Sequence, residues 1–194
     1  MSLSKLVIAS NNKKKRAEIE KILSGLNIEF VPASATTFID VIEDAPDFQG
    51  NAKKKADAFM QANQCAALAD DSGLCVNALN GSPGVYSARF AGEHATDADN
   101  NIKLLHDLKG FKDRSAYFIC ALHLSTPNNK HITAEGRVEG HIITEETGDT
   151  GFGYDPLFFC PELGKTFAQS GSQDKALVSH RGRALRNLQQ QLSE

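Results

Sequence analysis

The sequence lacks clustered cysteines. Its four cysteines, Cys65, Cys75, Cys120 and Cys160, lie far apart, and no spacing among them matches a zinc site, a redox pair or a dense disulfide framework. We therefore expect reduced thiols that are mostly buried in the core.

Long apolar runs and an excess of positive charge are also missing. No segment approaches the ~20 apolar residues of a membrane span, and the N-terminal residues have no apolar run long enough for a signal peptide. The 21 Lys and Arg residues are outnumbered by 24 Asp and Glu residues, for a net charge of −3, whereas a general nucleic-acid binder has a globally basic surface. We expect a cytoplasmic protein that binds neither membranes nor nucleic acid.

The sequence does contain alternating strand and helix patterns. At 194 residues, 41% of them hydrophobic, the chain suits one domain over residues 1–194. Strands are predicted at residues 5–10, 29–31, 66–69 and 74–79, helices at 51–64 and 97–108, and a β-hairpin at 116–124 and 131–143. Helical spacing of apolar residues predicts two more helices, one after Asn11 and Asn12 and one capped by Ser179. The pattern favours an α/β fold with a mixed sheet.

Two adjacent carboxylates, Asp70 and Asp71, follow the apolar run at 66–69. Charges just beyond the end of a buried strand fall where open α/β sheets bind their ligands. Because like charges repel, either a cation such as Mg²⁺ lies between them or one of them has a raised pKa and can act as a base. A solvated turn is the structural alternative, since Asp, Ser and Gly are ordinary turn residues.

Two basic clusters lie near predicted helix starts. Lys13, Lys14, Lys15 and Arg16 would occupy the first turn of the first helix, where the helix dipole disfavours a cation by up to about 1 kcal/mol. The second cluster, residues 53–55, repeats this arrangement. Free backbone N–H groups and lysines together form a phosphate site, although a solvated charge run explains either cluster alone. The two clusters and the acidic pair favour a Mg²⁺-bound polyphosphate.

Neither common glycine-rich nucleotide motif is present. The residues after the first strand do not follow the G-x-x-x-x-G-K-[ST] pattern of a P-loop. Gly151-Phe152-Gly153 is followed by Asp155-Pro156 rather than by a helix, unlike a dinucleotide fingerprint. The phosphates would therefore be held by side chains.

Five motifs remain to be explained together. They are Ser10-Asn11-Asn12-x-x-Lys15-x-x-Glu18, Ala69-Asp70-Asp71-Ser72-Gly73-Leu74, Pro83-Gly84-Val85-Tyr86-Ser87-Ala88-Arg89, Gly151-Phe152-Gly153-Tyr154-Asp155-Pro156 and Ser179-His180-Arg181-Gly182. In order and spacing they resemble the inosine/xanthosine triphosphate pyrophosphatase family. The resemblance implies hydrolysis of ITP, dITP and XTP to the monophosphate and pyrophosphate with Mg²⁺, one or more ions per subunit, by a homodimer. It also implies a single elongated α/β domain, with a mixed twisted sheet flanked by helices and two lobes around a deep substrate cleft.

The resemblance assigns roles to individual residues. Asp71 matches the catalytic base and a metal ligand, and Glu43 matches a second metal ligand. Phosphate and other substrate contacts fall on Ser10, Asn11, Asn12, Lys13, Lys14, Lys15, Lys55, Ser72 and Lys175. Recognition of the base falls on Phe152, Gly153, Tyr154, Asp155, His180 and Arg181. Arg181 only donates hydrogen bonds, so it suits the 6-oxo acceptor of hypoxanthine or xanthine and opposes the 6-amino group of adenine.

The chain also departs from the family pattern. Gly50 stands where the family commonly has Glu before the Asn-Ala of the second helix, and Gln169 stands where Glu commonly follows Thr-x-Ala. Structural readings stay open for single motifs, because His180 and Arg181 could cap a helix and Phe152 and Tyr154 could be core residues.

Two other functions are compatible with parts of the sequence. One is a Maf-type pyrophosphatase acting on pyrimidine nucleotides, which the His180-Arg181 motif opposes. The other is a catalytically disabled nucleotide- or RNA-binding module, which would leave the Asp70-Asp71 pair unexplained.

Overall fold

The computed structural model describes residues 3–193, except the side chain of Lys14, and divides into two compact units. The first unit contains residues 3–71, 120–136 and 181–193, and the second contains residues 72–119 and 137–180. Each unit is therefore assembled from stretches that are distant in the sequence.

Within these described residues the strands form one seven-stranded sheet with the order β2-β1-β3-β4-β5-β6-β7. The strands are β1 Lys5–Ile8, β2 Glu29–Phe30, β3 Ala66–Val76, β4 Ser115–Ser125, β5 His131–Ile142, β6 Phe158–Cys160 and β7 Lys165–Thr166. β1 pairs in parallel with β2 and β3, whereas β6 pairs antiparallel with β5 and β7. The predicted α/β class with a mixed sheet flanked by helices is confirmed.

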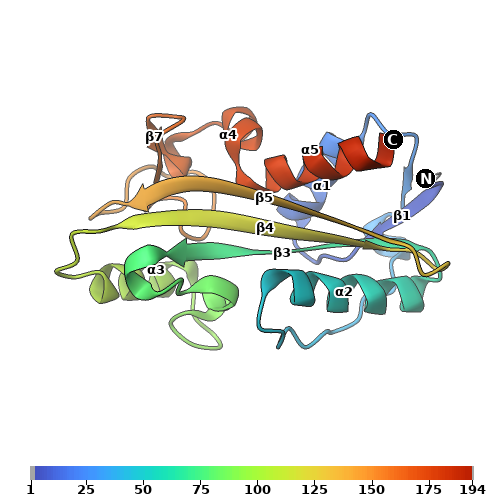
Figure 1. Ribbon diagram of the computed structural model, residues 1–194, viewed down its shortest axis with the longest axis horizontal. Coiled ribbons are helices and arrows are strands. Elements are labelled where there is room, and N and C mark those ends of the chain that lie inside the picture. The colour runs from blue at the N-terminus through green and yellow to red at the C-terminus, as the bar shows by residue number, and fades with distance from the viewer. Residues whose placement is uncertain (1–2, 194) are drawn as a thin grey trace. The chain divides into compact units, whose positions relative to one another are not determined.

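In the first unit, helices cover both faces of the strands (Figure 1). These helices are α1 Lys13–Leu23, α2 Phe48–Asn63 and α5 His180–Ser193. Ile8 and Leu68 share a core with residues of α1 and α5, whereas Ala67 and Ala69 share another core with residues of α2. Successive strand residues point to opposite faces. Asp70 consequently lies on the face covered by α1 and α5, and Asp71 lies on the α2 face.

β3 corrects the sequence prediction at the acidic pair. A strand at 66–69, then a turn, then a second strand from Leu74 was expected, but one strand runs through Ala66–Val76 with Asp70 and Asp71 inside it. Leu74 and Val76 are as fully buried as Leu68, so the chain stays extended between two apolar segments. Because the two carboxylates point to opposite faces, they cannot share one cation as the sequence suggested.

The start of α2 also differs from its prediction. The helix begins at Phe48 rather than at Asn51, because the Asp47 side chain caps it by accepting a 2.7 Å hydrogen bond from the Gly50 N–H. The lysines at 53–55 therefore lie in the second turn, away from the free N–H groups of the first. The first basic cluster does open a helix as predicted, since α1 begins at Lys13.

The second unit has its own aromatic core. Its helices are α3 Asp97–Asp107 and α4 Ser172–Val178, with short 3₁₀ segments at Asn77–Leu79, Gly84–Arg89 and Phe167–Gln169. Leu104 of α3 packs in one cluster with Phe118, Phe158 and Phe167. Thr96 and Asp99 form a reciprocal capping box at the start of α3. α4, β6 and β7 were not predicted, because such short elements carry little periodicity.

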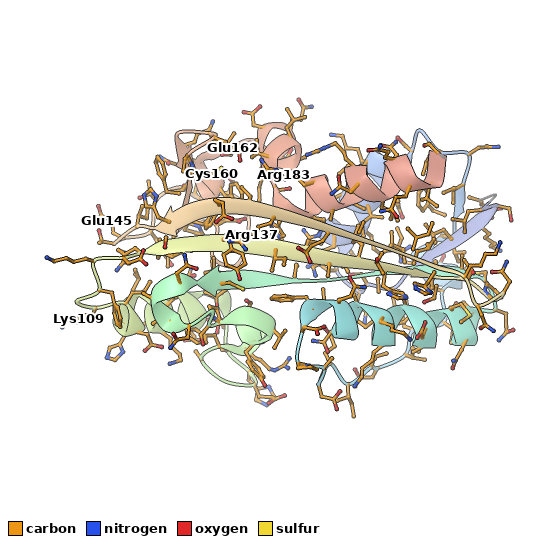
Figure 2. The ribbon with its side chains drawn as sticks, viewed as in Figure 1. Lys109, Arg137, Glu145, Cys160, Glu162 and Arg183 are labelled. Carbon is orange, nitrogen blue, oxygen red and sulfur yellow. The ribbon has the colours of Figure 1, made fainter. Side chains whose placement is uncertain are left out.

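An exposed cation also stabilises the sheet of the second unit. Figure 2 shows Arg137 on β5, and its guanidinium carbon lies 3.4 Å from the ring centre of Tyr117 on β4. Such a cross-strand cation–π contact is worth about 0.5–1 kcal/mol at an exposed site.

Cys75, Cys120 and Cys160 are buried and Cys65 is half-buried, so the prediction of mostly core cysteines is confirmed. Within residues 3–193, no helix is both long and apolar enough to cross a membrane.

Candidate active site

The predicted phosphate loop connects β1 to the start of α1. Asn12 caps the helix, since its Oδ1 accepts a 3.2 Å hydrogen bond from the Lys15 N–H, and the Asn12 N–H donates to Ser10 Oγ at 3.2 Å. Asn11, Asn12 and Lys13 are exposed, whereas Ser10 and Lys15 are half-buried. The loop therefore presents polar groups to solvent at a helix N-terminus, where backbone N–H groups attract anions.

Arg16 has a different environment from the lysines beside it. Its side chain is buried and donates to the carbonyl oxygens of Ile8 and Val31 at 2.8 and 2.9 Å. It thus anchors the start of α1 to the ends of two strand segments. The basic cluster predicted from sequence is therefore part structural and part exposed.

One buried carboxylate connects the phosphate loop to α5. Asp70, 2% exposed, pairs through one oxygen with Lys15 Nζ at 3.1 Å and with Arg181 Nε at 3.2 Å. Burial alone would raise the pKa of Asp70, but Lys15 and Arg181 outweigh it and hold this pKa well below its usual range. Arg181, itself 4% exposed, also donates to Glu18 at 3.1 Å. Asp70 is therefore an ionised structural link rather than a base.

Asp71 lies in a second cluster, on the α2 face of β3. Lys55 Nζ of α2 lies 2.9 Å from Glu43 Oε2 and 3.9 Å from Asp71 Oδ1. Asn51 Nδ2 donates to the other Asp71 oxygen at 3.1 Å. Burial raises the pKa of Asp71 to about 6, against the opposing effects of Lys55 and of the Asn51 hydrogen bond. The prediction that one acid of the pair has a raised pKa thus agrees with the geometry, and the main cause is burial.

The Asp71 cluster has the donor chemistry that Mg²⁺ prefers. Glu43 and Asp71 already face one cation, the Lys55 ammonium. Among residues 3–193, no three His, Cys, Asp or Glu side chains converge as a metal-holding group. Two carboxylates completed by substrate phosphates and water fit Mg²⁺, which is seldom held by protein ligands alone.

In the second unit, Asp155 organises the predicted base-recognition loop. This carboxylate is 3% exposed, accepts from the Phe152 N–H at 2.9 Å and pairs with Lys175. Lys175 Nζ lies 4.9 Å from the ring centre of Phe152 and 5.1 Å from that of Phe167. Gly151 has a φ of +85°, and a Cβ there would lie 2.2 Å from Asp155 Oδ2, so no other residue fits.

The neighbouring predicted residues of the second unit have distinct surroundings. Gly153 N–H donates to Asp97 Oδ2 at 2.7 Å, and the Tyr154 hydroxyl donates to the Ser87 carbonyl at 2.8 Å. Tyr154 and His180 are buried, while Phe152 is 39% exposed. The His180 ring stacks on Phe118 with centroids 4.8 Å apart. Phe152 is the aromatic side chain of this set that remains accessible for stacking.

The predicted site residues thus form three groups of neighbouring side chains. Lys15, Asp70 and Arg181 meet on one face of β3, and Glu43, Lys55 and Asp71 meet on the other. Phe152, Asp155 and Lys175 meet in the second unit. Ser72 is half-buried on β3, directly after Asp71. The side chain of Lys14 lies outside the described part of the chain.

Comparison with known proteins identifies the family. The model of the Ham1 family matches residues 6–191. The chain belongs to the Ham1 family. A dITP/XTP pyrophosphatase from Desulfotalea psychrophila is 49% identical over 181 residues, covering 93% of this chain and 81% of the relative. One from Clostridium perfringens is 46% identical and covers 98% of both chains. The solved structure of a Ham1 protein from Coxiella burnetii has a TM-score of 0.93 at 40% identity, covering 98% of this chain and 99% of that one.

Ham1 membership confirms the resemblance inferred from the five motifs. The sequence nevertheless missed polar residues that the structure places beside the predicted ones. Asn51 contacts Asp71, Glu18 contacts Arg181, and Asp97 contacts Gly153. Glu18 belongs to a quoted motif, so spacing alone could have indicated it. Asn51 and Asp97 lie far along the chain from Asp71 and Gly153, so spacing in the sequence did not indicate these contacts.

Proposed function

We propose that this Ham1 protein hydrolyses non-standard purine nucleoside triphosphates such as dITP, ITP and XTP to the monophosphate and pyrophosphate. The observation that carries the proposal is Asp71, a half-buried carboxyl with a pKa raised to about 6, facing Lys55 together with Glu43. Relatives named dITP/XTP pyrophosphatases supply the substrate class.

Asp71 acts in this proposal as the general base. A base works best when its pKa lies near the operating pH, and a value of about 6 leaves most Asp71 carboxylates ionised at neutral pH. Asp71 takes a proton from the water that attacks the α-phosphorus. The bond from that phosphorus to the bridging oxygen breaks, and pyrophosphate leaves with the electron pair.

Positive charge over the leaving pyrophosphate comes from several side chains. Lys15 lies at the helix N-terminus of the phosphate loop, Lys55 lies beside Asp71, and Lys175 lies beside Phe152. We assign Glu43 and Asp71 as the residues that hold Mg²⁺. When bound, this ion neutralises charge that develops on the phosphate oxygens.

Recognition of the base is proposed for residues of the second unit and for Arg181. The accessible ring of Phe152 offers a stacking surface, and Asp155 holds the backbone of this loop in place. The Arg181 guanidinium only donates hydrogen bonds, which suits a 6-oxo acceptor on the base. We further propose that the chain acts as a homodimer.

The purified protein should be incubated with Mg²⁺ and separately with ITP, XTP, ATP, GTP and TTP, with pyrophosphate and orthophosphate both measured. We expect pyrophosphate mainly from ITP and XTP. Orthophosphate alone would place the cleavage elsewhere, and a preference for TTP would favour the Maf-type activity. Tight nucleotide binding without turnover would identify a disabled binding protein.

A further inference from the structure

Asn51 holds two parts of the proposed metal site with one side chain. It lies in the first turn of α2 and is 1% exposed. Its Nδ2 donates to Asp71 Oδ2 at 3.1 Å, and its Oδ1 accepts from the Ala45 N–H at 2.9 Å. The first bond orients a carboxylate of β3, and the second fixes the backbone two residues after Glu43.

Gly50 allows the segment at 45–47 to lie close against α2. A Cβ at Gly50 would be 2.7 Å from the Ala45 Cβ and 3.1 Å from Asp47 Oδ1, and the first distance is far shorter than ordinary carbon contacts. Any larger residue would push this segment outward and stretch the bond from Ala45 to Asn51. Gly50, which stands where the family commonly has Glu, is therefore necessary for the hydrogen bond between Ala45 and Asn51.

The same contacts connect the two carboxylates through Lys55. Glu43 lies on the segment that Asn51 and Gly50 hold, and its Oε2 lies 2.9 Å from Lys55 Nζ. Asp71 lies 3.9 Å from the same nitrogen. The distance between Glu43 and Asp71 thus depends on where the 43–47 segment is held relative to α2.

We propose that Asn51 is a positioning residue that sets the spacing of the Glu43 and Asp71 carboxylates for a divalent cation, and that Gly50 makes this spacing possible. The inference rests on the proposed function for the identity of the two ligands. An amide suits the role because it donates to one carboxylate and accepts from a backbone N–H at once, whereas an aspartate could only accept. Groups that orient metal ligands typically change metal affinity 10- to 100-fold when removed.

The test compares Asn51→Ala and Gly50→Ala with Asn63→Ala. Asn63 is a matched control because it lies on the same helix and also holds a neighbouring loop, accepting from the Thr37 N–H at 2.8 Å. Binding of Mn²⁺ in the presence of imidodiphosphate is measured from the loss of the free-ion electron paramagnetic resonance signal. Steady-state kinetics with ITP give kcat and KM separately.

We expect Asn51→Ala to weaken Mn²⁺ binding at least 10-fold and to lower kcat more than it raises KM. Gly50→Ala should likewise weaken Mn²⁺ binding and lower kcat more than it raises KM. This variant keeps the proposal testable if Asn51→Ala does not fold. Asn63→Ala should leave Mn²⁺ affinity unchanged. Unchanged affinity in folded Asn51→Ala, or an equal loss in Asn63→Ala, would overturn the proposal. An inactive wild-type protein that still binds Mn²⁺ in this pattern would contradict the proposed function alone.

Discussion

Asp70 and Asp71 are adjacent carboxylates whose pKa values are shifted in opposite directions. Asp70 faces Lys15 and Arg181, which keep its pKa low, while burial raises the pKa of Asp71 to about 6. The alternation of strand side chains separates the two environments over a single peptide bond. One acid therefore stabilises the first unit, and the other remains available for proton transfer.

Replacing the proposed base should remove turnover and stabilise the fold. Raising the pKa of a carboxyl from 3.8 to about 6 makes its ionised form cost up to about 3 kcal/mol at neutral pH. Asp71→Asn removes this charge, so we expect no measurable pyrophosphate release and a thermal midpoint several degrees higher at pH 7.5. The difference should decline as the pH falls below about 6 and should vanish below about pH 4, where Asp71 is protonated in both the folded and the unfolded state.

The control for that experiment is Asp57→Asn. Asp57 pairs with Lys53 and accepts from Ser125, and these contacts lower its pKa despite the opposing effect of burial. Its ionised form therefore favours folding, so the substitution should lower the thermal midpoint at pH 7.5 and leave activity intact. Equal midpoints for wild type and Asp71→Asn at both pH values would contradict the raised pKa.

The pH dependence of catalysis tests the same carboxyl without a mutation. With Mg²⁺ limiting, kcat/KM should fall about tenfold per pH unit below pH 6, because only ionised Asp71 accepts a proton. Saturating Mg²⁺ favours the carboxylate and should move this acid limb to lower pH. A flat profile between pH 5 and 8 at limiting Mg²⁺ would remove Asp71 as the base.

At the scale of elements, side-chain hydrogen bonds hold the loop at 151–155. Asp155 binds the Phe152 N–H and Lys175 from within the second unit. The loop carries no helical or strand hydrogen bonds of its own around Phe152, as the secondary structure of residues 151–156 shows. Asp155 therefore holds the loop at Phe152, while Asp97 holds it at Gly153.

Asp155→Ala should loosen that loop selectively. The loss of a buried hydrogen bond to a charged group costs about 1.5–3 kcal/mol, so we expect faster amide hydrogen exchange at Phe152 and a higher KM for ITP. Asp155→Asn keeps an acceptor for the Phe152 N–H and should show a smaller increase in exchange. Identical exchange in both variants and in the wild type would mean that other contacts hold the loop.

The elements that the sequence predicted best are those with long apolar periodicity. α1, α3 and the β4–β5 hairpin were all expected, because their buried residues recur at the period of the structure they form. β3 was divided in two because Asp70, Ser72 and Gly73 are typical of turns, whereas burial on both sides keeps them extended. Tertiary packing overrode local propensity at that point.

The candidate site was predictable only in part. The family resemblance indicated Lys15, Asp71 and Lys175, which the structure places in polar clusters. The link from Asn51 to both Ala45 and Asp71 was not predictable, since it depends on how far a loop approaches a helix. The assigned roles of these residues stay predictions until the variants are measured.

At the scale of the whole molecule, the first unit is assembled from three stretches of chain. Asp70 connects two separate elements of this unit, because it pairs with Lys15 on α1 and with Arg181 on α5. The prediction of one domain over residues 1–194 stays a prediction. Strands β3, β4 and β5 each contribute residues to both units.

Stability in acid should depend on Asp70. Its pKa is lower in the folded state than in the unfolded state, so its contribution is present above pH ~4 and declines as the pH falls further. Asp70→Asn leaves Lys15 and Arg181 without their shared carboxylate and should lower the free energy of unfolding by about 3–5 kcal/mol at pH 7. Urea titrations should show that the free energies of unfolding of the wild type and of Asp70→Asn differ less at pH 3 than at pH 7. A difference that is the same at both values would contradict the lowered pKa.

The pairing of Asp70 with Arg181 also has a consequence during protein synthesis. The ribosome releases α1 and β3 well before α5, so the nascent chain carries Asp70 with Lys15 but without Arg181. The apolar face of β1 is likewise covered only in part, by Ile19 and Leu23 of α1, until Leu185 and Leu188 of α5 have been made. The first unit therefore completes its fold only after α5 has been synthesised. A product truncated before α5 would be a substrate for quality-control proteases rather than a partial enzyme.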